Sequence, residues 1–340
     1  MFKPNKPFII AEMSGNHNQS LDRALTIVDA AAKAGVDAVK IQTYTADTMT
    51  LDINEREFFI ADKNSLWKGE SLYSLYKKAY TPWEWHEAIF NRCKEWGIIG
   101  FSTPFDFTAV DFLEELKVPC YKIASFENVD LPLIKKVAKT GKPIIASTGM
   151  TTVAEIDDLV TTARNNGCND LTLLKCTSSY PATPEGTNLM TIPHMKELFR
   201  CRVGLSDHTL GIGAAVASIA LGGTVIEKHF TLSRAEGGVD SAFSLEPDEM
   251  ALLVRECNTA WQALGHISYE VAEQEKKSLQ FRRSLYIVED LKKGDVLTEK
   301  NVRSIRPGLG LSPKYYDVVL GKRVKCDVKR GTGLSWDVIE

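Results

Sequence analysis

Two histidines in this sequence each end a short apolar run, His208 after RVGLSD and His229 within TVIEKHF. If the two runs are neighbouring strands, the imidazole rings lie close together, and neutral imidazoles suit a divalent transition metal. Catalytic zinc usually has three protein ligands, so either an acidic residue adds a third or water and substrate complete the shell. The acidic candidates are Glu12, Asp207, Glu227 and Asp240. The alternative is that one or both histidines only form hydrogen bonds in a polar pocket.

Two lysines, Lys40 and Lys122, lie near the ends of two other apolar runs, and hydroxyl residues hold similar positions at Thr103, Ser125, Ser147 and Ser206. Lysine attracts phosphate or carboxylate as a point charge, while hydroxyls and backbone N–H groups complete such a site. A single lysine there is usually a surface group. Two lysines and several hydroxyls at one edge instead predict an anion pocket. Alternatively, Lys122 or Lys228 forms a Schiff base, as in metal-free aldolases.

Three acidic residues, Glu12, Glu127 and Asp240, are candidates for proton transfer or for binding sugar hydroxyls. A salt bridge to a nearby lysine explains any one of them equally well. Cys176 is interpreted as a small buried residue rather than a nucleophile, because the sequence places no base beside it.

These residues follow apolar runs that alternate with helical patterns, which predicts parallel strands buried on both faces. The runs are 8–17, 38–44, 97–105, 120–127, 143–150, 171–181, 202–208 and 224–230. Eight such units predict an α/β fold, a (β/α)8 TIM barrel with its active site at the carboxyl ends of the strands. Before the third run, Thr81 is the expected N-cap of a helix, with Glu84 three residues later.

Two stretches depart from this pattern. Residues 43–81 are too long for an ordinary loop and rich in aromatics, so they form either a lid over the barrel mouth or a small subdomain on its rim. From residue 285 the pattern changes to short strands and turns. We therefore predict a catalytic barrel over 1–265, a linker over 266–284 and a small β-rich domain over 285–340.

The bulk composition narrows the partners. With 340 residues, a net charge of −3 and a pI near 6.1, the chain has no global basic character, so nucleic acid and anionic membranes are not expected partners. The N-terminal apolar stretch is too short for a signal peptide. Seven cysteines without metal-binding spacing fit reduced thiols. A cytoplasmic protein is expected.

An ordered set of motifs resembles the sialic acid synthase family: IIAEMSGNHNQS, KIQTYTADTM, FSTPFD, YKIAS, STGM, CTSSYP, GLSDHT and EKHFTL. The last 55 or so residues, with KKGDVLTEKNVRSIRPGLG, resemble its antifreeze-like (SAF) domain. The resemblance spans the whole chain. It implies a transferase that condenses phosphoenolpyruvate with an amino sugar, requires a divalent metal, often Mn²⁺ (Mg²⁺ or Co²⁺ being alternatives), and forms a domain-swapped homodimer.

The same resemblance assigns roles by motif. His208 and His229 would bind the metal. Glu12 and Glu127 are assigned to catalysis from their chemistry and not by motif, with Glu127 as the general base. Phosphoenolpyruvate would contact Lys40, Thr103, Lys122, Ser125, Ser147 and Ser206. The sugar would contact Tyr180, Asp240, Phe281 and Arg306, the last two reaching the site of the partner subunit.

Two departures point to one branch of the family. Gln19 stands where sialic acid synthases usually have glycine, and Ser178 where they have asparagine. EMSGNHNQS with KIQTYTADTMTL resembles the pseudaminic acid synthase branch, whose acceptor is 2,4-diacetamido-2,4,6-trideoxy-L-altrose; N-acetylmannosamine is the alternative acceptor. We expect Met13 to contact the methyl group at C6 of that sugar.

Overall fold

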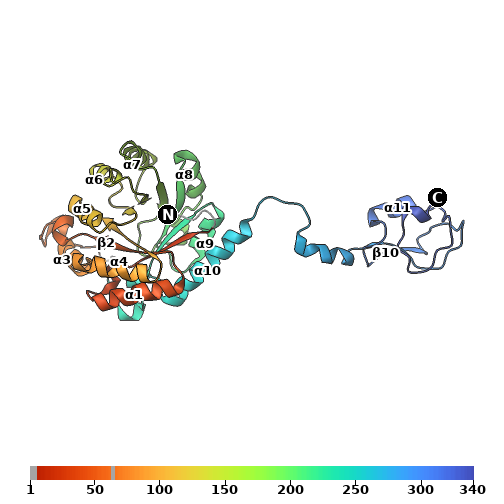
Figure 1. Cartoon of the computed structure of the whole chain (residues 1–340), viewed down its shortest axis with the longest axis horizontal. Helices are drawn as coiled ribbons and strands as arrows, with labels where there is room; N and C mark the ends of the chain where they lie inside the picture. Colours follow the sequence, from red (N-terminus) through yellow and green to blue (C-terminus); the bar gives the residue numbers. More distant parts are fainter. Residues whose placement is uncertain (1–5, 63–65) are drawn as a thin grey trace. The chain divides into compact units, whose positions relative to one another are not determined.

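The computed structural model describes residues 6–62 and 66–340, and the chain divides into two compact units, 1–265 and 266–340. The first unit is a closed barrel of eight parallel strands paired in sequence order, visible with its surrounding helices in Figure 1. The strands are β1 (Phe8–Glu12), β2 (Ala38–Thr43), β3 (Ile99–Pro104), β4 (Tyr121–Ile123), β5 (Ile144–Ser147), β6 (Leu171–Cys176), β7 (Arg202–Asp207) and β8 (Val225–His229). Each lies within a predicted run, so the predicted barrel is confirmed.

Helices cover the outside of the barrel through apolar faces. In α1 (Leu21–Ala34) the buried side chains include Ala24, Ile27 and Ala31, at the spacing of one helical face. Ser20 caps its N-terminus, and Gly35 ends it in the left-handed region at φ 90°. The other covering helices are α4 (His86–Glu95), α5 (Phe107–Glu115), α6 (Leu131–Ala138), α7 (Val153–Asn165), α8 (Thr191–Phe199), α9 (Gly213–Ala220) and α10 (Pro247–Leu264).

The barrel interior is apolar at one end and polar at the other. Ile10, Phe101 and Val225 belong to one buried cluster inside the barrel. Because side chains two residues apart share a face of a strand, Glu12, Thr103 and Glu227 lie above them on the same inward face. The apolar layer closes one end of the barrel, and the polar residues lie at the carboxyl ends of the strands.

The long segment after β2 lies at the polar end of the barrel. Its described residues form α2 (Ala46–Met49), the 3-10 helix η2 (Arg56–Phe58) and α3 (Leu72–Ala79); residues 63–65 lie outside the described part. The predicted cap at Thr81 is wrong, because a 3-10 turn, η3 (Trp83–Trp85), precedes α4. The Thr81 hydroxyl instead lies 3.3 Å from His17 Nε2.

The second unit has its own small core. The 3-10 helix η7 (Glu273–Phe281) precedes an antiparallel pair, β9 (Ser284–Ile287) and β10 (Val302–Ile305). Isolated bridges join other extended stretches, and η8 (Pro313–Tyr315), α11 (Tyr316–Val319) and η9 (Trp336–Val338) complete the unit. Leu285, Val302, Val324 and Leu334 are fully buried together.

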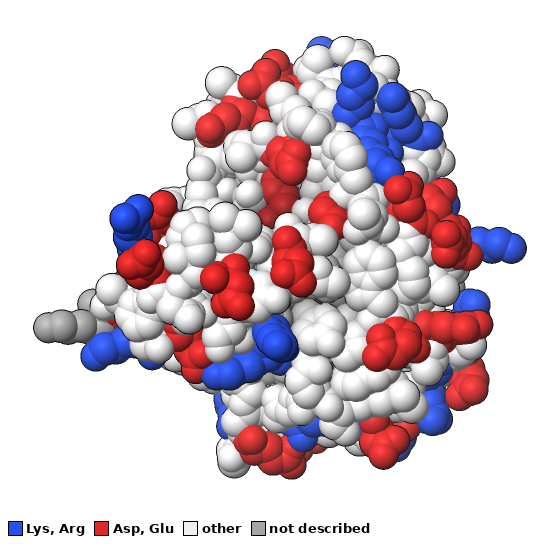
Figure 2. Space-filling view, turned by 90° about the vertical axis from the view of Figure 1, so that its left-hand side faces the viewer, with Lys and Arg blue, Asp and Glu red and all other residues white. Residues whose placement is uncertain are grey.

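The surface bears on possible partners. Figure 2 shows acidic and basic side chains interspersed on the face that it draws, in agreement with the small net charge of −3. In residues 6–62 and 66–340, no helix has the length and apolarity to cross a membrane.

Candidate active site

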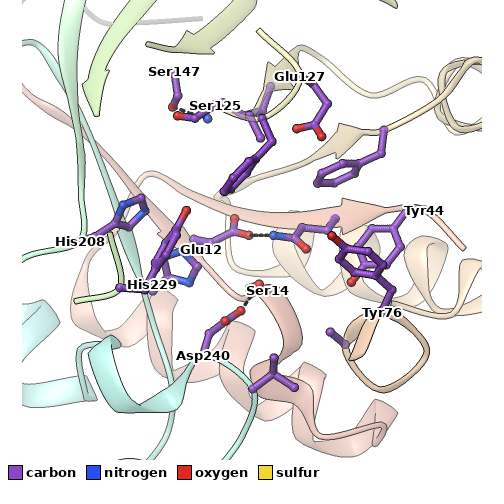
Figure 3. Close-up of a pocket in the computed structure, with 18 of the residues that line it drawn as sticks. Glu12, Ser14, Tyr44, Tyr76, Ser125, Glu127, Ser147, His208, His229 and Asp240 are labelled. Carbon is purple, nitrogen blue, oxygen red and sulfur yellow. Dashed lines mark hydrogen bonds between the residues drawn. The ribbon is translucent and has the colours of Figure 1, made fainter. Parts of the chain in front are cut away.

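A cavity of about 320 Å³ lies at the carboxyl ends of the barrel strands. Figure 3 shows its side chains converging from several strands, with Glu12 between the two histidines on one side and Tyr44 and Tyr76 on the other. The structure thus brings together most of the residues predicted for the site: Glu12, Lys40, Lys122, Ser125, Glu127, Ser147, Tyr180, Ser206, His208, His229 and Asp240. Thr103 does not line the cavity but accepts a hydrogen bond from Lys40 Nζ at 3.1 Å.

Four buried charged residues form one network on the cavity floor. Lys40 Nζ lies 2.9 Å from Glu12 Oε2 and 3.6 Å from Glu227 Oε1, and Lys122 Nζ lies 3.4 Å from Glu227 Oε1. All four side chains are almost completely excluded from solvent. Buried charges are costly unless paired. The alternation of lysine and glutamate therefore explains how two ammonium groups remain in the interior.

Burial and pairing shift the pKa values of this network in different directions. Burial raises the pKa of Glu12 to about 7, although Lys40 opposes the shift. Burial also acts to raise the pKa of Glu227, but the two lysines outweigh it and the pKa falls below its usual value. Burial lowers the pKa of Lys122. For Lys40, burial is outweighed by Glu12 and Glu227, so the pKa is raised. Protonation of Glu12 near pH 7 would leave an excess of positive charge, which favours an anionic ligand.

Hydroxyl groups surround the lysines. Lys122 Nζ donates to Ser147 Oγ at 2.7 Å, and Ser206 Oγ donates to Glu227 Oε1 at 3.3 Å. The amide of Gly149 donates to Ser125 Oγ at 3.1 Å. A Cβ at Gly149 would come within 2.2 Å of Ser178 Oγ, so only glycine allows this loop to approach so closely. Ammonium, hydroxyl and amide groups together provide the donors expected of an anion pocket.

The two histidines are neighbours on adjacent strand ends. Their ring centroids lie 5.4 Å apart, and both point into the cavity (Figure 3). His208 Nδ1 lies 2.9 Å from the Thr177 carbonyl oxygen, so Nδ1 carries the proton of that hydrogen bond. In the neutral ring, Nε2 is then unprotonated, and its lone pair is available to a metal. His229 Nδ1 is buried without a hydrogen-bond partner in the described part of the chain. These nitrogens fit a divalent transition metal.

The acidic candidates for a third metal ligand have other partners. Asp207 lies outside the cavity, where its Oδ2 accepts from Lys228 Nζ at 2.6 Å. Asp240 Oδ2 accepts from Ser14 Oγ at 2.5 Å. Within the described ranges, no cluster of three or more histidine, cysteine, aspartate or glutamate side chains is arranged to hold a metal. A metal held by the two histidines alone would therefore need water or substrate to complete its shell.

Three interpretations from the sequence are corrected. Met13 is completely buried in the main hydrophobic core and does not line the cavity, so its expected contact with the sugar is wrong. Lys228 is buried outside the cavity with Asp207, so it is not placed to form a Schiff base with a ligand there. Cys176 is buried as predicted, but a histidine does lie beside it, since its sulfur is 3.9 Å from His208 Nδ1. That nitrogen carries the proton donated to Thr177, so it is not a base for the thiol.

Several residues that line the cavity were not predicted as site residues. The Gln42 amide donates to Glu12 Oε1 at 3.2 Å, and Tyr44 is buried beside Phe105. The segment after β2 contributes a largely apolar side: Met49, Ile60, Trp67, Leu72, Leu75, Tyr76 and Ala79. The unusual length and aromatic content of residues 43–81 was the signal for this side, and the segment lines the mouth as expected under both the lid and the subdomain interpretations.

Two predicted sugar contacts lie in the second unit. Phe281 ends η7 with 58% of its surface exposed, and Arg306 follows β10 on an exposed turn. Within the first unit, the Tyr180 ring lies 4.4 Å from that of His208 and 5.1 Å from that of Phe243. Tyr180 and Asp240 therefore line the cavity next to the histidines, while the roles of Phe281 and Arg306 stay predictions.

A closed parallel barrel with lysines, acids and histidines buried at its carboxyl ends defines a barrel enzyme whose polar cavity has the donors for an anion. Residues 27–269 match the NeuB family model and residues 282–340 match the SAF domain model, and the chain belongs to the NeuB family.

Known proteins resemble the chain over most of its length. It is 45% identical to pseudaminic acid synthase of Campylobacter jejuni, over 97% of this chain and 96% of the relative. Identity to pseudaminic acid synthase of Helicobacter pylori is 42%, over 98% of both. The crystal structure of N-acetylneuraminic acid synthetase from Leptospira borgpetersenii, in complex with citrate, superposes with a TM-score of 0.72 at 31% identity, covering 82% of this chain and 92% of that one.

Proposed function

We propose that this protein is a pseudaminic acid synthase, a transferase that condenses phosphoenolpyruvate with 2,4-diacetamido-2,4,6-trideoxy-β-L-altropyranose to give pseudaminic acid and phosphate. The observation that carries the proposal is the 42% and 45% identity to two pseudaminic acid synthases over nearly the whole chain. The 31% identity to an N-acetylneuraminic acid synthetase supports the alternative, N-acetylmannosamine, less strongly.

Phosphoenolpyruvate would bind in the anion pocket. Lys40 and Lys122 would attract its phosphate and carboxylate, and Thr103 would orient Lys40 through the 3.1 Å hydrogen bond. The hydroxyls of Ser125, Ser147 and Ser206 would complete the contacts. Burial strengthens each of these charge interactions, because the surroundings screen them less than water does.

A divalent metal would bind His208 and His229. We propose Mn²⁺, with Mg²⁺ or Co²⁺ as the alternatives. The proposal is supported by the Nδ1 proton of His208, which leaves Nε2 free, and by the unpaired buried nitrogen of His229. When bound, the ion would polarise the aldehyde of the opened sugar as a Lewis acid. Tyr180 and Asp240, beside the histidines, would position the sugar.

The residues around the pocket suit the bond changes of the reaction. C3 of phosphoenolpyruvate forms a bond with C1 of the sugar, the carbonyl π bond at C1 opens, and its oxygen takes up a proton. Water then adds to C2 and gives up a proton. Glu127 is the proposed acceptor of that proton, and burial raises its pKa to about 7, a suitable value for a general base. Glu12 is the second acidic residue that we assign to catalysis, and it belongs to the network with Lys40 and Lys122. The C–O bond then breaks, and Lys40 and Lys122 stabilise the phosphate that leaves.

The quaternary structure we propose is a homodimer in which Phe281 and Arg306 of each chain complete the site of the other. The RPGLG turn resembles the antifreeze-like (SAF) domain of the sialic acid synthase family, and both side chains are exposed. These two observations support the proposal. Mixing inactive His208→Ala and Arg306→Ala proteins after joint refolding should restore activity in hybrid dimers, since one of the two sites would then contain neither substitution. No recovery in verified hybrids would reject the shared site.

We also place the protein in the cytoplasm. All seven cysteines are free thiols, and five of them are buried in the first unit. Free thiols are usual in a reducing compartment.

The decisive experiment is phosphate release from phosphoenolpyruvate with Mn²⁺, with either the altrose derivative or N-acetylmannosamine, each with and without a chelator. Metal-dependent release with the altrose derivative alone is the expected result. Release with N-acetylmannosamine alone would assign the enzyme to the sialic acid branch. Chelator-resistant turnover of pyruvate, trapped by borohydride at Lys122, would instead identify the remote alternative, a Schiff-base aldolase.

A further inference from the structure

Gln19 has an unfavourable backbone conformation, and its side-chain amide forms two hydrogen bonds to main-chain carbonyls. Its φ is +55°, in the left-handed region that residues other than glycine rarely adopt. Its side-chain amide donates to the carbonyl oxygens of Tyr80 at 2.7 Å and Lys78 at 3.0 Å. A strained backbone conformation at a residue with such directed bonds points to a role for the side chain.

The two carbonyls mark the end of helix α3. Carbonyls in the last turn of a helix have no partner within the helix, so an external donor can fix where the helix ends. Lys78 lies in the last turn of α3, and the chain leaves the helix at Tyr80. The Gln19 amide therefore acts as a cap supplied from the turn after β1, about sixty residues away in the sequence.

Two further contacts join the same turn to the same end of α3. A Cβ at Gly15 would lie 3.3 Å from both Cα and Cβ of Ala79, so glycine there lets the helix approach closely. His17 Nε2 lies 3.3 Å from Thr81 Oγ1. With Gln19, the turn thus holds residues 78–81 at three points.

The position of α3 determines one side of the cavity. Leu72, Leu75, Tyr76 and Ala79 line the cavity, and their spacing is that of a single helical face. Three of these side chains are aliphatic, and Tyr76 adds an aromatic ring (Figure 3). A shift of the helix end would move this face relative to the strand ends, which the closed barrel holds in place.

We propose that Gln19 is a positioning residue that fixes the end of α3, so that the apolar face of α3 receives the methyl groups of the acceptor sugar. This proposal rests on the proposed function, because the methyl at C6 and those of the two acetamido groups belong to that acceptor. An apolar surface prefers a methyl to a hydroxymethyl group by a modest factor, on the order of tenfold.

Amide hydrogen exchange tests the positioning directly. Gln19→Ala removes both donors, and Gln19→Gly removes them while relieving the backbone strain, so both variants should accelerate exchange in the last turn of α3. The expected acceleration is about fivefold, the effect of roughly one net hydrogen bond. Asn18→Ala is the matched control, because Asn18 is also left-handed, with φ +48°, but its amide donates to Gly237. It should leave α3 exchange unchanged. Equal exchange in Gln19→Ala and the unsubstituted protein would overturn the proposal.

Steady-state kinetics tests the consequence for the sugar. Gln19→Ala should raise KM for the altrose derivative about fivefold, by the same hydrogen-bond argument, and leave KM for phosphoenolpyruvate within about twofold. Equal increases in both KM values, or none, would reject a selective effect on the sugar. If the unsubstituted protein does not turn over the altrose derivative, the proposed function fails, and the exchange experiment still decides whether Gln19 positions α3.

Discussion

The two sides of the cavity are built from different kinds of element. The lysines, the two histidines, Glu12 and Glu227 lie on or directly after barrel strands, whose positions are fixed by a closed ladder of backbone hydrogen bonds. The apolar side is carried by the segment after β2, and α3 is joined to the barrel largely through side chains and one close glycine contact. Figure 3 shows the contrast, with His208 and His229 on one side of Glu12 and Tyr76 on the other. The polar side, fixed by the barrel strands, therefore suits the making and breaking of bonds. The apolar side, carried by the segment after β2, suits the selection of the substrate.

The largest expected effect comes from the polar side. His229→Ala should reduce turnover by about a thousandfold or more, because a Lewis acid contributes several kcal/mol to the transition state. Loss of Mn²⁺ binding should accompany it in electron paramagnetic resonance titrations of free Mn²⁺. His194→Ala is the control, since His194 lies outside the cavity. Full activity of His229→Ala in the presence of chelator would refute the metal assignment.

Removing a lysine from the floor should have the next largest effect. Lys122→Met leaves Glu227 with one ammonium partner fewer and removes a donor to the anion. We expect KM for phosphoenolpyruvate to rise about a hundredfold, the size of a lost charge-assisted contact in a buried site. The matched control is Lys175→Met, since Lys175, like Lys122, is the second-last residue of its strand but donates to the Cys176 carbonyl and does not line the cavity. Similar KM values in the two variants would contradict the anion pocket.

The pH dependence tests the acid at the rim. Burial raises the pKa of Glu127 to about 7, so its carboxylate form, the one able to accept a proton, increases as the pH rises through 7. The rate should therefore increase over that range, and Glu127→Gln should abolish this limb together with most activity. The stability of the fold should change with pH in the opposite direction to the rate. The contribution of Glu127 to stability is complete below its usual pKa of 4.5 and is lost as the pH rises toward 7. A rate limb unchanged in Glu127→Gln would assign the titration to another group.

The smallest effect should come from the apolar side. Leu75→Gln introduces a polar side chain on the face of α3 while retaining a good helix former. KM for the altrose derivative should rise about five- to tenfold, as expected for one lost apolar contact, with KM for phosphoenolpyruvate unchanged. Leu252→Gln, on the outer helix α10 and away from the cavity, is the control. If the Leu75 substitution altered phosphoenolpyruvate binding as strongly, the two sides would not be separate in function.

The sequence was most informative where a regular pattern met a chemical residue type. Lys40, Lys122, His208 and His229 were predicted to converge because each ends or follows an apolar run, and they do converge. The pattern failed at Thr81, whose local capping signal is overridden by the contact with His17. A propensity of about 1 kcal/mol is easily outweighed by tertiary contacts.

Alternation along the strands explains the other errors. Asp207 and Lys228 were candidates for the cavity because they stand beside His208 and His229, yet they pair with each other outside it. Adjacent residues of a strand face opposite sides, so a one-residue difference decides between the cavity and the helix layer. The position of a strand end does not reveal which of two neighbours faces inward.

The order of apolar runs and helical patterns was thus sufficient for the barrel and for the edge at which its polar residues gather, because both follow from local periodicity. Tertiary structure alone decided which side chains share the cavity and what forms its apolar side. Met13 is excluded by packing in the core, whereas α3 is brought in by contacts between residues 15–19 and 78–81. Such contacts depend on the distance between segments remote in sequence, and no local pattern encodes that distance.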